Sequence, residues 1–177
     1  MQVAGKPLKV LVVYYSFAGH TRTIAEHVAR AAQADVEELR GVGEPSGMGS
    51  RHYFWVLRHL LLSQKPELVA VEHDASRYDL VILGSPVWLG TFSPAVRSYI
   101  RSAPLAGKRV ALFCSYRNSP GPAFKHVTRM LKQSTVLPTT LSVLDPVTAG
   151  PAVIAIRTQR WVHDLESLLD AESKAQA

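Results

Sequence analysis

The chain has 177 residues and a mass of 19.4 kDa, which suits one α/β domain with a single large core and is too short for two full domains. Hydrophobic residues make up 47% and charged residues 19% of the sequence, a profile that excludes collagen-like, mucin-like and disordered proteins. The formal net charge is +6, but no nucleic-acid-binding motif accompanies it, so the excess of Lys and Arg indicates a solvated surface and no nucleic-acid partner.

Cysteine content and hydropathy restrict the cellular compartment that we expect for this protein. The only cysteine, Cys114, cannot form an internal disulfide, and its apolar sequence neighbours predict a buried, unreactive thiol. No signal peptide opens the chain, and no apolar run approaches the length that a bilayer requires. We therefore expect a cytoplasmic protein with no membrane span.

The first predicted strand covers residues 8–15, LKVLVVYY, a continuous apolar run typical of a strand buried on both faces of a parallel sheet. It stops abruptly at a short turn over residues 16–21. Apolar residues then recur at helical spacing from Ile24 to Ala32, which predicts a helix after the turn. We predict a short second strand over residues 35–39.

The next segment differs in composition from the rest. Residues 41–50, GVGEPSGMGS, are dense in Gly, Pro and Ser and predict a flexible loop. Residues 52–63, HYFWVLRHLLLS, fit a helix that is apolar nearly all round, which must be buried, lie at an interface or lie over a ligand. We treat about 41–70 as an insertion in a single domain, 1–177, whose core covers about 8–170.

The remaining sequence continues to alternate strands and helices. Strands are predicted over 78–85, 108–115 and 135–144, and helices over 93–101, around Val127 and around Trp161. Pro138 has no amide hydrogen to donate to a neighbouring strand, so we place the last strand at an edge of the sheet.

This alternation predicts an α/β fold: a doubly wound, five-stranded parallel sheet with helices on both faces. Each right-handed crossover returns the chain to the same end of the sheet, where the next strand starts in the same direction. Ligands of such sheets bind outside the carboxyl ends of the strands, where the strand order reverses. We therefore expect loops 16–21, 86–92 and 115–122 to form the site.

The first of these loops has the features of an anion site. Small and hydroxyl residues lie between a buried strand and the start of a helix, where backbone amides and the helix dipole favour negative charge. The Ser16 and Thr21 hydroxyls are additional donors. The loop has neither the Walker A spacing nor a GxGxxG pattern, which disfavours nucleoside triphosphates and a Rossmann-type dinucleotide.

The other two loops carry aromatic rings, Trp88 and Tyr116. Aromatic rings beside a phosphate site suit a flat, phosphorylated ring system, although each could instead be a core or interface side chain.

His52 and His59 lie seven residues apart with no carboxylate at ligand spacing, so no metal site is predicted. The absence of a GxSxG elbow argues against a Ser hydrolase.

Three separated motifs agree with one family. YYSFAGHTRTIA, YDLVILGSPVWLGTFSPAVRSYI and KRVALFCSYRNSPGPAF resemble the flavodoxin-like FMN-binding proteins over about residues 8–170. The resemblance implies the strand order 2-1-3-4-5 and FMN as cofactor, with its phosphate on the first loop, its ring between the other two, and a Leu89–Gly90 backbone contact to flavin N5. The implied cofactor-binding residues are Ser16, Phe17, Ala18, Gly19, His20, Thr21, Pro86, Val87, Trp88, Leu89, Gly90, Ser115, Tyr116, Arg117, Asn118 and Gly121.

The resulting expectation is an FMN-binding redox protein that transfers electrons through the flavin to or from a partner protein, with no catalytic side chain. One alternative is an FMN-dependent oxidoreductase, a quinone or flavin reductase whose cationic loops attract NAD(P)H, since no Asp or Glu occurs between Leu80 and Leu144. Another is an interaction module with weak flavin binding. The 52–63 helix would then mediate a homodimer, or it would cover the flavin as a lid.

Overall fold

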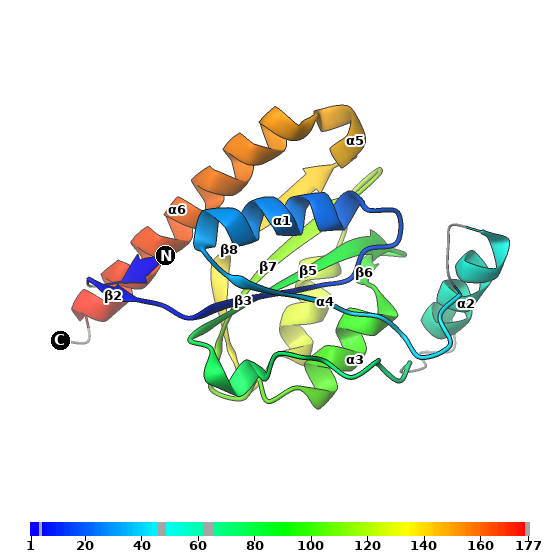
Figure 1. The fold of residues 1–177 in the computed structure, drawn as a ribbon, viewed down its shortest axis with the longest axis horizontal. Coiled ribbons are helices and arrows are strands. Elements are labelled where there is room, and N and C mark those ends of the chain that lie inside the picture. The colour runs from blue at the N-terminus through cyan, green and yellow to red at the C-terminus, as the bar shows by residue number, and fades with distance from the viewer. Residues whose placement is uncertain (4, 46–48, 62–65, 176–177) are drawn as a thin grey trace.

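The computed structural model describes residues 1–3, 5–45, 49–61 and 66–175. Five parallel strands form its central sheet (Figure 1): β3 Val10–Tyr14, β4 Asp35–Glu38, β5 Leu80–Trp88, β7 Arg109–Tyr116 and β8 Thr135–Leu144. They lie in the order β4-β3-β5-β7-β8, which is 2-1-3-4-5 when these five strands are numbered along the chain. The predicted fold class and strand order are therefore confirmed.

Helices cover both faces of this sheet, as Figure 1 shows. The helices are α1 His20–Ala32, α2 Ser50–Leu61, α3 Pro94–Ser102, α4 Ala123–Met130, α5 Pro146–Ala149 and α6 Pro151–Ala175, with a 3₁₀ turn at Ala75–Arg77. Helices α1 and α6 pack on one face, and α3 and α4 pack on the other. Alternate residues of β3 enter the two cores, Val12 on the α1 side and Val13 on the α3 side, which explains why this strand is apolar throughout.

Two short antiparallel pairs were not expected. Strands β1 Gln2–Val3 and β2 Lys6–Pro7 pair with each other, and β6 Thr91–Phe92 pairs with the end of β5. The prediction of a loop over 86–92 was therefore wrong, because β5 continues to Trp88 and turns back through Leu89 and Gly90. Both turn residues have positive φ, 49° and 69°, which is the geometry of a two-residue type I′ hairpin. Its usual Asn-Gly or Asp-Gly signal is absent from the sequence.

The edge position predicted for 135–144 is confirmed. Strand β8 is the last strand of the sheet, and its pairing with β7 shifts between Val110, opposite Val136, and Leu112, opposite Thr140. Pro138 falls inside this irregularity. A residue without an amide hydrogen is thus placed where the ladder is already interrupted.

The insertion lies at the carboxyl ends of the strands, at the right of Figure 1. Helix α2 begins at Ser50, two residues before the predicted start, and the predicted last residues, Leu62 and Ser63, lie outside the described part of the chain. The two ends of the insertion meet beside β4, where the Val42 amide donates to the Glu67 carbonyl at 2.7 Å and the Val69 amide donates to the Arg40 carbonyl at 2.9 Å. The segment therefore leaves and rejoins the domain at one place.

Cys114 lies in β7 with none of its surface exposed, and burial raises the pKa of its thiol to about 12. Because the unfolded thiol titrates near pH 9, the native state holds this proton more tightly, and stability falls as pH rises from about 9 towards 12. We expect Cys114→Ala to lessen the loss of unfolding free energy between pH 9 and 10 by about 1 kcal/mol per pH unit. Urea unfolding at pH 7, 9 and 10 measures this, and equal slopes in the two proteins would contradict it.

Candidate functional site

A cavity of about 540 Å³ opens at the carboxyl ends of the strands, where the strand order reverses between β3 and β5. Residues from all three predicted loops line it: Phe17, Ala18, His20 and Thr21 from the first, Pro86, Val87, Trp88 and Leu89 from the second, and Ser115, Tyr116 and Arg117 from the third. Ser16, Gly19, Gly90, Asn118 and Gly121 are not among its lining residues. The topology thus brings together loops that are about 70 and 100 residues apart in the sequence.

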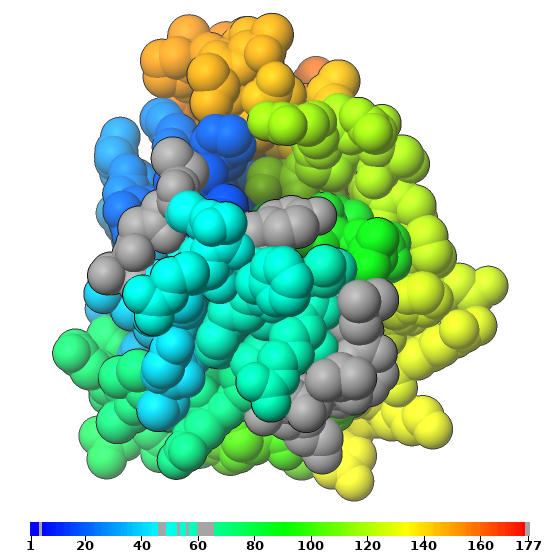
Figure 2. Space-filling model, turned by 90° about the vertical axis from the view of Figure 1, so that its right-hand side faces the viewer, coloured from blue at the N-terminus to red at the C-terminus, as the bar shows by residue number. Residues whose placement is uncertain are grey.

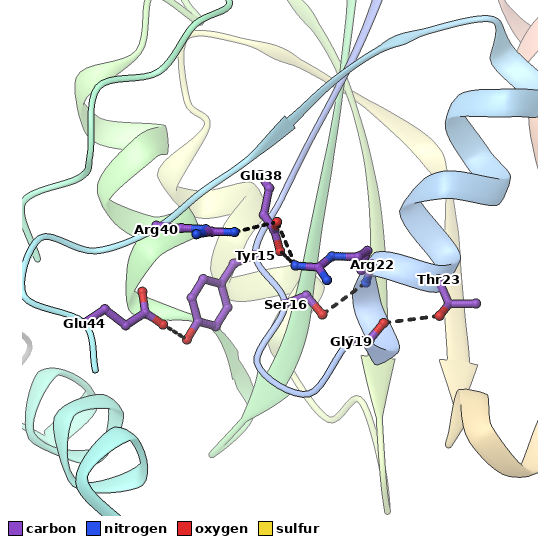
Figure 3. A network of polar contacts seen from close by, with 8 residues as sticks. All are labelled: Tyr15, Ser16, Gly19, Arg22, Thr23, Glu38, Arg40 and Glu44. Carbon is purple, nitrogen blue, oxygen red and sulfur yellow. Dashed lines mark hydrogen bonds and ion pairs between the residues drawn. The ribbon is translucent and has the colours of Figure 1, made fainter. Parts of the chain in front are cut away.

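The first loop leads directly into the N-terminus of α1. Gly19 is the N-cap, with a φ of 84° that glycine adopts without strain and with no side chain over the first amides of the helix. The Arg22 amide donates to the Ser16 hydroxyl oxygen at 3.1 Å (Figure 3). The Ser16 side chain therefore closes the loop and lies at the helix start. An anion beside Ala18 and His20 would meet the positive end of the α1 dipole.

Thr21 and Ser115 join the first loop to the third. Both side chains are buried, 1% and 5% exposed, and their hydroxyl oxygens lie 2.8 Å apart. One hydroxyl donates to the other, so one of the two protons remains free for another acceptor. The sequence predicted a donor hydroxyl on Thr21 alone. In the structure the available proton belongs either to Thr21 of the first loop or to Ser115 of the third.

Charged side chains divide into two groups. Arg22, which follows the loop, turns away to Glu38 and forms contacts of 2.6 and 2.8 Å with its carboxylate, to which Arg40 adds a contact at 3.6 Å (Figure 3). Arg117 and Asp145 instead line the cavity. A hydrogen bond from Thr148 lowers the pKa of Asp145, with a smaller contribution from the nearby positive charge of Arg117.

Aromatic rings form one wall of the cavity. The rings of Phe17 and Trp88 meet edge to face with centroids 5.8 Å apart, and Tyr15 meets Trp88 at 5.8 Å from behind. Trp88 thus packs against its neighbours and lines the cavity at once. Tyr116 lines the cavity from the third loop.

Glycines hold the second and third loops together. A Cβ atom at Gly90 would lie 3.1 Å from the Pro122 ring, and one at Gly121 would lie 3.9 Å from the Gly90 Cα. The absence of side chains at Gly90 and Gly121 allows the two loops to approach, and the role of both residues in cofactor binding stays a prediction. Leu89, which lines the cavity, is 73% exposed.

Three lining residues were missed: Leu57, Asp145 and Pro146. Asp145 directly follows the last strand, so the rule that selected the other loops would have found it had the loop after residue 144 been included. Leu57 lies on α2, and no local signal in the sequence gives the position of that helix over the sheet. Figure 2 shows α2, in cyan and teal, in the middle of the face at the carboxyl ends of the strands.

The described residues contain no group of three or more His, Cys, Asp or Glu side chains arranged to hold a metal ion. Within the same ranges, every helix is too short or too polar to cross a bilayer.

A doubly wound parallel sheet with a cavity at its switch point defines a class of α/β proteins that bind small molecules between the first, third and fourth strands. A family model described as the flavodoxin domain matches residues 60–151, more than half of the chain. The chain therefore belongs to the flavodoxin-domain family.

Individual relatives agree with this family. An NAD(P)H dehydrogenase (quinone) of Gluconacetobacter diazotrophicus is 29% identical over 145 residues, which cover 73% of this chain and 69% of the relative. One of Cupriavidus metallidurans is 32% identical over 99 residues, or 54% of this chain and 46% of the relative. The crystal structure of a Lactobacillus acidophilus flavoprotein in complex with FMN shares the fold, with a TM-score of 0.65, 21% identity, and coverage of 80% of this chain and 96% of that one.

Proposed function

We propose that this chain is an FMN-binding redox protein that passes electrons through the bound flavin. One observation carries the proposal: the same cavity is lined by residues at the N-terminus of a helix and by aromatic rings from neighbouring loops. This arrangement complements a phosphate ester attached to a flat ring. The Lactobacillus acidophilus flavoprotein, crystallised with FMN, has the same fold.

The residues present fit such a cofactor. Backbone amides near Ala18 and His20, with the Ser16 hydroxyl, would hold the phosphate at the start of α1, and the Thr21–Ser115 pair has one hydroxyl proton to donate. Trp88 and Tyr116 would hold the ring from two loops. When bound, FMN supplies reversible one- and two-electron chemistry. The chain binds the phosphate, orients the ring and limits the access of water to it.

A specific observation favours the reductase alternative. Two relatives carry the name NAD(P)H dehydrogenase (quinone), and the exposed Arg117 lies in the cavity, where it would attract an anionic hydride donor. The chain lacks Asp and Glu from 81 to 144, so few acidic groups would oppose that approach. NAD(P)H and a quinone are the proposed partners under this alternative, and an acidic redox protein is the proposed partner otherwise.

Titration of the apoprotein with FMN tests the proposal. We expect the flavin fluorescence to be quenched on binding and the dissociation constant to be about 1 μM or lower, because amides, hydroxyls and aromatic rings act together on one ligand. Riboflavin, which lacks the phosphate, is the control and should bind more weakly. An unchanged flavin spectrum at micromolar protein would contradict the proposal.

Anaerobic mixing of the FMN-loaded protein with NADPH separates the two redox functions. Loss of the 450 nm flavin absorbance within seconds to minutes would support the reductase. A flavin that stays oxidised would leave electron transfer with a partner protein.

A variant at an exposed position of α2 tests the proposed homodimer. Phe54 on α2 is 73% exposed, so Phe54→Glu would oppose association through this helix without removing a buried contact. Light scattering of wild type and variant measures the mass, and a monomeric wild type would rule this dimer out.

A cytoplasmic location remains part of the proposal, since a lone free thiol is usual in a reducing compartment.

A further inference from the structure

Three polar side chains from separate segments meet behind the aromatic wall: Tyr15 after β3, Glu44 in the insertion and His52 on α2. The Tyr15 hydroxyl donates to the Glu44 Oε1 atom (Figure 3), and His52 Nε2 lies 2.7 Å from the same oxygen and 3.0 Å from the Tyr15 hydroxyl. The other carboxylate oxygen accepts from the Gly41 amide at 2.8 Å. We call Tyr15, Glu44 and His52 the anchor cluster.

The anchor cluster is buried, so each of its polar groups needs a hydrogen-bond partner within the protein. Tyr15 is 2% and His52 7% exposed, and the Glu44 side chain is 11% exposed. Burial, and then the neighbouring Glu44, raise the pKa of Tyr15 far above its ordinary value, so the phenol remains a hydrogen-bond donor at neutral pH. Removal of one member would leave the others buried without their partner, which costs more than the hydrogen bond itself contributes.

Close packing adds to this polar contact. The Trp55 indole of α2 lies directly over Gly41, where a Cβ atom would come within 2.4 Å of the ring. Trp55 also packs against His59 of its own helix, with ring centroids 4.2 Å apart. The helix is therefore fitted to the start of the insertion by shape as well as by hydrogen bonds.

The anchor cluster also contacts the cavity wall. His52 meets the Phe17 ring edge to face at 4.4 Å, and Tyr15 meets Trp88 at 5.8 Å. Phe17 and Trp88 line the cavity, and α2 itself contributes Leu57 to the lining. His52 of α2 and Tyr15 thus each contact one of the two rings, and Glu44 joins these two residues to each other.

We propose that Tyr15, Glu44 and His52 are positioning residues that fix the insertion helix as the ring-side wall of the cavity and so set how tightly the flavin ring is held. This inference rests on the proposed FMN site. None of the three lines the cavity, so they act through Phe17, Trp88 and Leu57 rather than on the flavin itself.

Two conservative variants test the proposal. Glu44→Gln keeps the size of the side chain but loses its charge, and Tyr15→Phe keeps the ring against Trp88 but loses the hydroxyl. Phe54→Leu is the matched control, because Phe54 is on the same helix and is 73% exposed, outside the contacts of the anchor cluster described above. Far-ultraviolet circular dichroism establishes that each variant is folded.

Two measurements are made on each protein. In the apoproteins, trypsin cleavage after Arg51 and Arg58 reports how firmly α2 is held, and we expect both test variants to be cut about tenfold faster than wild type and Phe54→Leu. In the FMN-loaded proteins, we expect about tenfold faster FMN dissociation and a changed visible circular dichroism of the flavin, with Phe54→Leu like wild type. The circular dichroism band reports the ring environment, which a loss of stability elsewhere would leave unchanged.

The outcomes separate this proposal from the proposed function. Equal cleavage rates in the apoproteins overturn it, whatever the flavin does. Faster cleavage with unchanged FMN dissociation and an unchanged flavin band also overturns it and leaves FMN binding intact. A wild type that binds no FMN overturns the proposed function, and with it the flavin-holding role, while the cleavage rates still decide whether the anchor cluster holds α2.

Discussion

Ala18→Asp is expected to lower the affinity for FMN by about 100-fold. Ala18 is exposed, lines the cavity and lies two residues before the start of α1. A carboxylate there would stand next to a phosphate monoester that carries up to two negative charges. Two charges about 4 Å apart repel by roughly 1 to 4 kcal/mol at a protein surface, and about 3 kcal/mol corresponds to 100-fold in affinity.

Two controls isolate charge from shape. Ala18→Asn has nearly the same size as the Asp variant but no charge, so we expect its FMN affinity to stay within a few-fold of wild type. Riboflavin has no phosphate, so its affinity should not distinguish Ala18→Asp from Ala18→Asn. Isothermal titration at two salt concentrations measures both ligands, and the loss for FMN should shrink as salt screens the repulsion. An equal loss of FMN affinity in the Asn variant would indicate that the phosphate does not bind at the first loop.

Gly84→Ala is expected to destabilise the fold by about 3 kcal/mol. Gly84 lies in β5 between Tyr14 of β3 and Phe113 of β7. A Cβ atom here would lie 2.0 Å from the Phe113 ring. That ring is fully buried and packs against Trp161, so it cannot move aside without disturbing the core, and overpacking of this kind costs 1 to 3 kcal/mol or more.

A double-mutant cycle tests the cause. Phe113→Leu alone should destabilise by leaving a hole, but combined with Gly84→Ala it should cost less than the sum of the two, because the added methyl group occupies vacated space. Gly49→Ala is the control, since a Cβ at that exposed position meets no atom of the described residues within 4 Å. Urea unfolding measures the four proteins of the cycle and this control. Additive losses would show that the ring is not what Gly84 accommodates.

The main elements of the fold were predictable because their signals are local. Strand β3 is a continuous apolar run that must be covered on both faces, and the turn at 16–21 with the apolar spacing after it specifies a strand, loop and helix. The β5–β6 hairpin was not predicted because Leu89 adopts a left-handed backbone conformation, which the residue type Leu does not indicate. Its conformation is imposed by the pairing of Trp88 with Thr91 on either side of it.

The amino-acid sequence by itself predicted the strands of the doubly wound sheet, the three loops at its carboxyl edge and the start of α1, because the signal for each of these elements lies within about ten positions. Only the tertiary structure decided that Thr21 bonds to Ser115, that Leu57 reaches the cavity, and that Glu44 and His52 meet Tyr15. These contacts join residues between 29 and 94 positions apart or place a helix over the sheet. The packing of the whole chain selects them, since no local preference brings such distant side chains together.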